Sequence, residues 1–168
     1  NAAALGARVS LLALVGGDEP GVQLKRLMDE EGVEASLHVD AAISTTVKLR
    51  VIGRQQQLLR IDFETSPSRD ALLAKLSEFQ RRLPEFDAVL LSDYGKGGLT
   101  HIAEMIRLAR AAGKIVLVDP KGDDYSGYAG ATVITPNRAE LRDVVGRWKD
   151  EADLEARATV LRKQLDLT

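Results

Sequence analysis

The sequence predicts an α/β fold, with a mainly parallel sheet, flanking helices and a small antiparallel hairpin. Short apolar segments of strand length alternate along the chain with longer segments whose apolar residues recur at helical spacing. This alternation is typical of a parallel sheet with helices packed on both faces. A stretch at about 44–64 interrupts the alternation, because two neighbouring segments there have the two-residue period of strands.

The first part of the chain predicts a strand, a helix and a second strand. The continuous apolar run "RVSLLALVG" (8–16) is typical of a strand buried on both faces. Asp18 is a candidate N-cap, and Pro20 lies in the first turn of a helix that we expect to end near Gly32. The segment "ASLHVD" (35–40) is predicted to be a short strand.

The segments "TTVKLRVI" and "QLLRIDF", separated by "GRQQ", predict a β-hairpin with one solvated face. Apolar residues of both segments fall on one face, and Lys48, Arg50 and Arg60 fall on the other. We interpret the hairpin as an insertion standing off the main sheet. Its basic face suits a lid that closes over an anionic substrate and excludes water. For each basic residue taken singly, an ordinary solvated sheet face is the alternative.

After Pro67 the pattern becomes helical and then alternates again to the end of the chain. Leu72, Leu76, Phe79 and Leu83 form one apolar stripe of a helix. The remaining predicted elements are a strand "DAVLLS", a helix "THIAEMIRLARAAG", strands "KIVLVD" and "ATVIT", a helix "NRAELRDVVG" and a last helix from about Asp150 to Leu165.

Composition limits the class of protein. The 168 residues are 45% hydrophobic and 29% charged, as in a soluble globular domain, and the net charge of −2 gives no general attraction to nucleic acid or anionic membranes. Cysteine is absent, which excludes a disulfide scaffold and is compatible with a reducing compartment. Both ends of the sequence resemble interrupted elements, so we expect residues 1–168 to be a partial domain of a longer protein.

Three predicted strands end in polar turns, "SDYGKGG", "DPKGDD" and "TPNRAE". The carboxyl ends of parallel strands share one edge of a sheet, where ligands bind in open α/β folds. Asp93 could accept hydrogen bonds from a sugar, and Lys96 and Lys121 could neutralise phosphates. The alternative for any one of these residues is a helix cap or an ordinary turn.

The turn "TPNRAE" supports two interpretations. Asn137 and Glu140 have the spacing of a capping box, in which each side chain satisfies a backbone N–H of the other. They could equally place Asn137 toward a nucleotide phosphate and Glu140 toward water held by Mg²⁺, which prefers oxygen ligands.

Several common catalytic patterns are missing from the sequence. There is no GxSxG, no P-loop GxxxxGK[ST] and no GxGxxG after the first strand, which argues against a serine hydrolase, a Walker-type ATPase and a Rossmann dehydrogenase. His38 and His101 have no metal-binding spacing.

The ordered strings "LLSDYGKGGL", "LVDPKG" and "VITPNRAEL", after the hairpin, resemble the ribokinase (PfkB) family of sugar kinases over essentially the whole chain. The resemblance implies a ribokinase-like fold, the cofactors ATP and Mg²⁺, and transfer of the γ-phosphoryl group to a sugar hydroxyl. The ATP-binding residues it implies are Asn137, Arg138, Ala139, Glu140 and Lys121. The substrate-binding residues it implies are Asp93, Lys96, Lys48, Arg50 and Arg60. Glu140 would meet Mg²⁺ through water.

Within the family, "QQLLRIDFE" is similar to the heptose 7-phosphate kinases. This similarity implies phosphorylation of D-glycero-D-manno-heptose 7-phosphate at the anomeric hydroxyl, in the cytoplasmic synthesis of ADP-heptose for lipopolysaccharide. It also implies fusion to an adenylyltransferase domain and a homodimer formed through the lid. The alternatives are a kinase for a fructose or tagatose phosphate, and a non-catalytic nucleotide- or sugar-binding module.

Two motifs of the family do not occur in the sequence. One is the sugar-binding Gly-Gly…Asn motif, and the other is the "GAGD" string that supplies the aspartate base. Gly16-Gly17-Asp18 does not replace the latter, because it follows the first strand. We therefore expect no catalytic residue within this chain and no activity from residues 1–168 alone.

Overall fold

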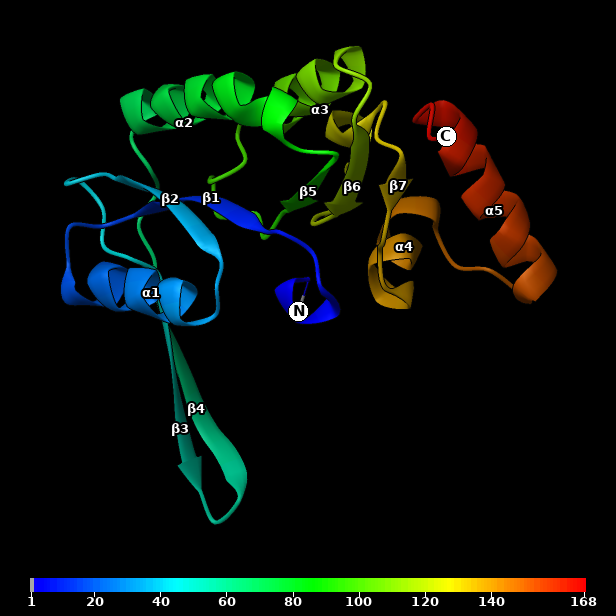
Figure 1. Ribbon diagram of the computed structural model, residues 1–168. Coiled ribbons are helices and arrows are strands. Elements are labelled where there is room, and N and C mark those ends of the chain that lie inside the picture. The colour runs from blue at the N-terminus through cyan, green and yellow to red at the C-terminus, as the bar shows by residue number, and fades with distance from the viewer. Residues whose placement is uncertain (1) are drawn as a thin grey trace. The chain divides into compact units, whose positions relative to one another are not determined.

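The computed structural model describes residues 2–168, and the chain divides into two compact units, Asn1–Lys75 and Leu76–Thr168. The division falls inside helix α2 (Arg69–Arg82). The α/β class is confirmed, and strands, helices and the hairpin follow one another in the predicted order (Figure 1).

The N-terminal unit contains a β-α-β element. Strand β1 (Ser10–Val15) pairs in parallel with β2 (Glu34–Val39), and α1 (Glu19–Glu30) connects them. Helix α1 begins at the predicted N-cap, because the Asp18 side chain accepts a hydrogen bond from the Gly21 N–H at 3.1 Å. A hydrogen bond between residues three positions apart therefore determines where this helix begins.

The predicted hairpin is present as β3 (Val47–Gly53) and β4 (Gln56–Phe63), which pair antiparallel (Figure 1). Arg54 and Gln55 form the two-residue turn, and both have positive φ, 46° and 69°. Positive φ at both central positions is what a turn matching the strand twist requires, although Asn-Gly is the usual sequence.

The two faces of the hairpin differ in chemistry as predicted, but both are exposed. The register places Arg50 opposite Arg60 on one face and Leu49 opposite Ile61 on the other. The prediction of a single solvated face is wrong, because the apolar face is also open to solvent. Its side chains are 37–52% exposed at Leu49, Val51, Leu59, Ile61 and Phe63.

Two aspartates fix the chain where it enters and leaves the hairpin. Asp18 accepts hydrogen bonds from Thr45 N at 2.8 Å and Thr45 Oγ1 at 2.5 Å, and Thr45 Oγ1 in turn accepts the Gly16 N–H at 2.9 Å. Asp40 accepts the Ser68 N–H at 2.9 Å. The hydrogen bonds from Thr45 lower the pKa of Asp18, as the Ser68 N–H lowers that of Asp40, so both carboxylates act as charged acceptors.

The C-terminal unit is built on a three-stranded parallel sheet in the order β5-β6-β7. The strands are β5 (Ala88–Ser92), β6 (Ile115–Asp119) and β7 (Val133–Ile134). The helices after them are α3 (Ile102–Ala111), α4 (Arg138–Val145) and α5 (Glu151–Gln164). The parallel strands of the chain thus belong to two separately hydrogen-bonded sheets rather than to one.

The core of this unit lies between α3 and one face of the sheet. Helix α3 buries Ile102, Met105, Ile106 and Ala109, and the strands facing it bury Leu91, Val116 and Val118. On the opposite face Leu90 is 70% exposed and Val133 41% exposed. Flanking helices are present as predicted, but this opposite face is only partly covered within residues 76–168.

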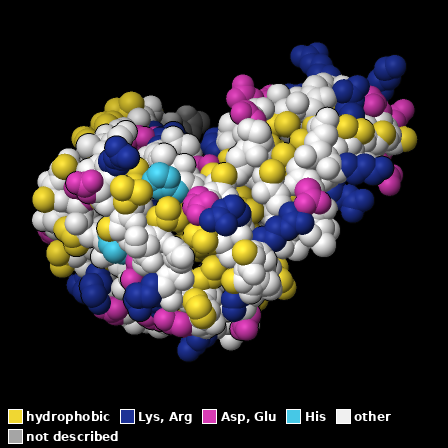
Figure 2. All heavy atoms as spheres, turned by 90° about the horizontal axis from the view of Figure 1, so that it is seen from above, with side chains coloured by type: hydrophobic (Ala, Val, Ile, Leu, Met, Phe, Trp, Pro, Cys, Tyr) yellow, Lys and Arg dark blue, Asp and Glu magenta, His cyan; other side chains and the backbone are white. Residues whose placement is uncertain are grey.

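The surface carries charges of both signs. Acidic and basic side chains are interspersed on the face shown in Figure 2, and the sequence contains 23 basic and 25 acidic residues. Among residues 2–168, no helix is both long enough and apolar enough to cross a bilayer.

Candidate functional site

The three polar turns of the C-terminal unit converge at the carboxyl edge of the β5-β6-β7 sheet, as predicted. Parallel pairing brings Ser92 opposite Asp119, and the Asp93 N–H continues the ladder to the Asp119 carbonyl at 2.9 Å. Pairing of β6 with β7 places Thr135 beside them, since its N–H donates to the Val118 carbonyl at 2.9 Å. The three turns that follow these strands therefore all begin at the same carboxyl edge of the sheet.

The turn after β5 is held tightly around Asp93. The Gly95 N–H donates to Asp93 Oδ1 at 2.8 Å, and Gly95 has a φ of +66°, which favours glycine. A Cβ at Gly95 would lie 3.7 Å from Lys121 Cγ, so the turns after β5 and β6 are in close proximity. Lys96 is exposed in the same turn.

Tyr128 connects these two turns, and it was not among the predicted site residues. Its hydroxyl lies 2.9 Å from Asp93 Oδ2, and it accepts the Lys121 N–H at 3.0 Å. Burial raises the pKa of Tyr128 to about 12, so the phenol keeps its proton at neutral pH. The contact joins residues 35 positions apart, and no local pattern in the sequence indicates it.

Asn137 and Glu140 form the capping box that one interpretation of the sequence predicted. Asn137 Oδ1 accepts the N–H groups of Ala139 at 2.9 Å and Glu140 at 3.0 Å, and Glu140 Oε2 accepts the Asn137 N–H at 3.0 Å. The second Glu140 oxygen is 3.2 Å from Lys121 Nζ. These bonds use Asn137 Oδ1, so its amide Nδ2 is the group that could donate to a ligand.

The charge state of Glu140 determines whether it can contact a metal ion. The Asn137 N–H and then the Lys121 ammonium hold the pKa of the Glu140 carboxyl below its usual value, so the group is ionised at neutral pH. Residues 2–168 contain no cluster of three or more acidic, histidine or cysteine side chains that could enclose a metal. A single ionised carboxylate fits contact with Mg²⁺ through water, and it does not fit a protein cage.

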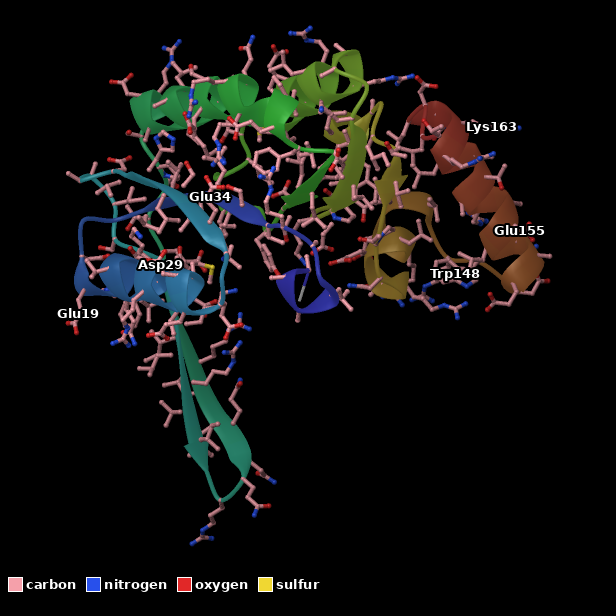
Figure 3. All side chains as sticks on the ribbon, in the orientation of Figure 1. Glu19, Asp29, Glu34, Trp148, Glu155 and Lys163 are labelled. Carbon is pink, nitrogen blue, oxygen red and sulfur yellow. The ribbon has the colours of Figure 1, made fainter. Side chains whose placement is uncertain are left out.

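The other predicted residues of α4 have structural contacts. Ala139 contributes its backbone N–H to the Asn137 cap. The Arg138 guanidinium forms an ion pair with Glu151 and lies 5.7 Å from the ring centre of Trp148. Trp148 lies in the connection between α4 and α5 (Figure 3).

Lys48, Arg50 and Arg60 form a separate group on the hairpin of the N-terminal unit. The register places Lys48 opposite Asp62 and Arg50 opposite Arg60. Arg60 Nη2 lies 3.1 Å from Asp62 Oδ2. Asp62 thus compensates Arg60, while Arg50 lies directly opposite Arg60, so these four side chains together leave the face with a net positive charge.

Comparison with known proteins identifies the family. Residues 1–166 match the family described as pfkB family carbohydrate kinase. The chain is 52% identical over 167 residues to the D-beta-D-heptose 7-phosphate kinase of Bordetella bronchiseptica, covering 99% of this chain and 53% of that protein. It is 44% identical to the bifunctional protein HldE of Methylococcus capsulatus, covering 99% of this chain and 35% of that protein. The chain thus spans about half of the first relative and a third of the second.

Solved structures agree on the fold. A PfkB protein from Polaromonas sp. JS666 is similar with a TM-score of 0.74 at 18% identity, over 97% of this chain and 59% of that one. Ribokinase from Giardia lamblia is similar with a TM-score of 0.72 at 15% identity, over 88% of this chain and 48% of that one. The ribokinase-like fold expected from the motifs is therefore confirmed, and the chain belongs to the pfkB family of carbohydrate kinases.

Proposed function

We propose that the protein containing this chain is an ATP-dependent kinase that phosphorylates D-glycero-D-manno-heptose 7-phosphate at its anomeric hydroxyl, giving the 1,7-bisphosphate. The observation that carries this assignment is the 52% identity, over 99% of the chain, to a relative named D-beta-D-heptose 7-phosphate kinase. The convergence of Asp93, Lys121 and Glu140 at one sheet edge supports it, because phosphoryl transfer depends on positioning and charge neutralisation.

In this proposal the sheet edge has a sugar side and a nucleotide side. Asp93 accepts hydrogen bonds from the sugar, and Lys96 in the same turn faces phosphate. Lys121, the Asn137 amide and the first turn of α4, which includes Arg138 and Ala139, bind ATP. The N-terminal end of a helix favours such negative charge.

Mg²⁺ would be held mainly by the nucleotide and would meet Glu140 through water, neutralising charge on the transferred group. The γ-phosphoryl group leaves ADP as a bond forms to the sugar oxygen, whose proton passes to an aspartate base. The 168 residues contain no "GAGD" string. We infer that another part of the protein supplies the base, and that residues 1–168 alone give no turnover, since general-base catalysis contributes about 10²–10⁴-fold.

The hairpin has two roles in the proposal. Its basic face, with Lys48, Arg50 and Arg60, attracts the anionic substrate, and its apolar face forms a homodimer contact. Exposure of Leu59 at 52% and Phe63 at 51% supports the second role, because exposed apolar clusters mark interfaces. We further propose a fused adenylyltransferase domain and reaction in the cytoplasm, where ATP and sugar phosphates are available.

The test is phosphorylation by the full-length protein, measured as ADP formation with D-glycero-D-manno-heptose 7-phosphate and, in parallel, fructose 6-phosphate. We expect turnover on the heptose, and a loss of kcat/KM in Lys96→Ala. Activity on fructose 6-phosphate alone would leave a kinase with a different acceptor. Inactivity on both, with retained ATP or sugar binding, would indicate a non-catalytic binding module.

A further inference from the structure

The ring of Tyr128 is fixed by its surroundings. Tyr128 is 3% exposed at the end of the short 3₁₀ helix Ser126–Tyr128. Its ring packs edge-to-face on that of Tyr125, which is 2% exposed, with the ring centres 5.3 Å apart. Because the ring cannot move without disturbing this packing, the position of its hydroxyl is defined by the fold.

The hydroxyl of Tyr128 faces two backbone groups and one carboxylate. It accepts the Lys121 N–H at 3.0 Å, and it lies 2.9 Å from Asp93 Oδ2 and 3.0 Å from the Lys121 carbonyl. A phenol has one hydrogen to donate, and a carboxylate is a stronger acceptor than a carbonyl. The hydrogen therefore goes to Asp93.

Asp93 is consequently held at both of its oxygens. Oδ2 accepts from Tyr128, and Oδ1 accepts the Gly95 N–H at 2.8 Å. Each carboxylate oxygen has a further lone pair, so an oriented carboxylate can still accept a hydroxyl from a ligand. Loss of the Tyr128 bond would leave the Asp93 carboxylate with the Gly95 N–H of its own turn as its remaining hydrogen bond of these two.

We propose that Tyr128 is a positioning residue, whose hydroxyl aligns Asp93 for the sugar and ties it to the turn that carries Lys121. The inference rests on the proposed function, because it takes Asp93 as a sugar-binding group. The connection continues beyond Tyr128, since Lys121 Nζ pairs with Glu140 Oε1 at 3.2 Å. A single chain of contacts thus links the sugar side of the site to the nucleotide side.

The test compares Tyr128→Phe with Tyr125→Phe in the full-length protein. Both changes remove one oxygen from a buried ring, but the Tyr125 hydroxyl has no hydrogen-bond partner among residues 2–168. We expect Tyr128→Phe to lower kcat/KM for the sugar phosphate about tenfold, with KM for ATP changed less. For Tyr125→Phe, we expect kcat/KM for the sugar phosphate to stay within about twofold of the wild-type value. Equal effects of the two changes would overturn the inference.

A double-mutant cycle separates positioning from general destabilisation. If Tyr128 acts through Asp93, Tyr128→Phe should cost much less kcat/KM in an Asp93→Ala background, which has no acceptor for the phenol, than in the wild type. Additive effects of the two changes would show that Tyr128 acts independently of Asp93, and would overturn the inference.

Hydrogen exchange gives a readout that needs no turnover. Tyr128→Phe should speed deuterium exchange at the Gly95 amide, which is bonded to Asp93 Oδ1, while Tyr125→Phe should not. If Tyr128→Phe does not fold, Asp93→Ala, which removes the acceptor of the phenol hydrogen, must speed exchange at the Lys121 amide, and unchanged exchange there overturns the inference. A wild-type protein without turnover on any sugar phosphate would remove the proposed function, whereas the exchange data would still decide whether Tyr128 holds Asp93.

Discussion

Lys121 Nζ lies 3.2 Å from Glu140 Oε1, and this ion pair joins the turn after β6 to the first turn of α4. The other Glu140 oxygen accepts the Asn137 N–H at 3.0 Å. One carboxylate therefore completes a helix cap and neutralises a lysine of the candidate site. The two interpretations of the "TPNRAE" turn, cap and ligand site, are compatible, because the cap uses Asn137 Oδ1 and leaves the amide Nδ2 as a donor for the proposed nucleotide.

The double role of Glu140 predicts a pH dependence of stability. Its folded-state pKa is lowered from an ordinary value of 4.5, so its contribution is present above pH 4.5 and is lost as the pH falls through the folded value. Urea unfolding should show Glu140→Gln less stable than the wild type at pH 7, with the difference shrinking below pH 4.5. Glu155→Gln, on the exposed side of α5 (Figure 3), is the control. A difference that does not vary with pH would contradict the prediction.

The position of Lys121 beside Glu140 predicts that replacing this lysine weakens ATP binding. Lys121→Met removes a cation beside Glu140 while retaining the aliphatic stem, and we expect ATP to bind the full-length protein about tenfold more weakly. Isothermal titration with ATP measures this directly. Lys163→Met, in the last turn of α5, removes an exposed charge and should leave ATP affinity unchanged. Equal affinities for all three proteins would exclude Lys121 from the ATP site.

Features set by short segments were predictable from the sequence. The Asp18 and Asn137 caps, the alternation in the hairpin and the strand-end turns depend on residues within a few positions of each other, so their patterns are visible in the sequence. Convergence of the turns followed from parallel pairing alone.

Features that depend on distant residues were not predictable. The Tyr128–Asp93 bond spans 35 positions, and Thr45 reaches Asp18 across 27, so neither has a local pattern. The division of the parallel strands into two sheets depends on which strand edges meet, which apolar periodicity does not encode. Alternation likewise assigned Leu49 and Ile61 to one face but gave no information on whether anything covers that face.

The bonds around Thr45 predict a sharp difference between two adjacent glycines. A Cβ at Gly16 would lie 2.5 Å from the Ile43 carbonyl oxygen and 2.9 Å from Thr45 N, so the backbone leading into the hairpin would have to shift. A Cβ at Gly17 would meet only the Val39 side chain at 3.6 Å, an ordinary contact. We expect Gly16→Ala to lower the melting temperature by at least about 4 °C, and Gly17→Ala by less than about 2 °C. Thermal unfolding followed by circular dichroism tests this. Similar melting temperatures for the two variants would argue against close packing of Gly16 on Ile43 and Thr45.

The exposed apolar face of the hairpin predicts a homodimer of the full-length protein. Leu49 and Ile61 are cross-strand partners and are 47% and 37% exposed, so a second copy could cover both. Light scattering coupled to size-exclusion chromatography should give a dimer mass for the wild type and a monomer mass for Ile61→Glu, because a buried unpaired carboxylate is costly at an interface. Arg60→Glu changes a neighbouring residue on the opposite face and should remain dimeric. A monomeric wild type, or a dimeric Ile61→Glu with unchanged circular dichroism, would show that this face does not form the dimer contact.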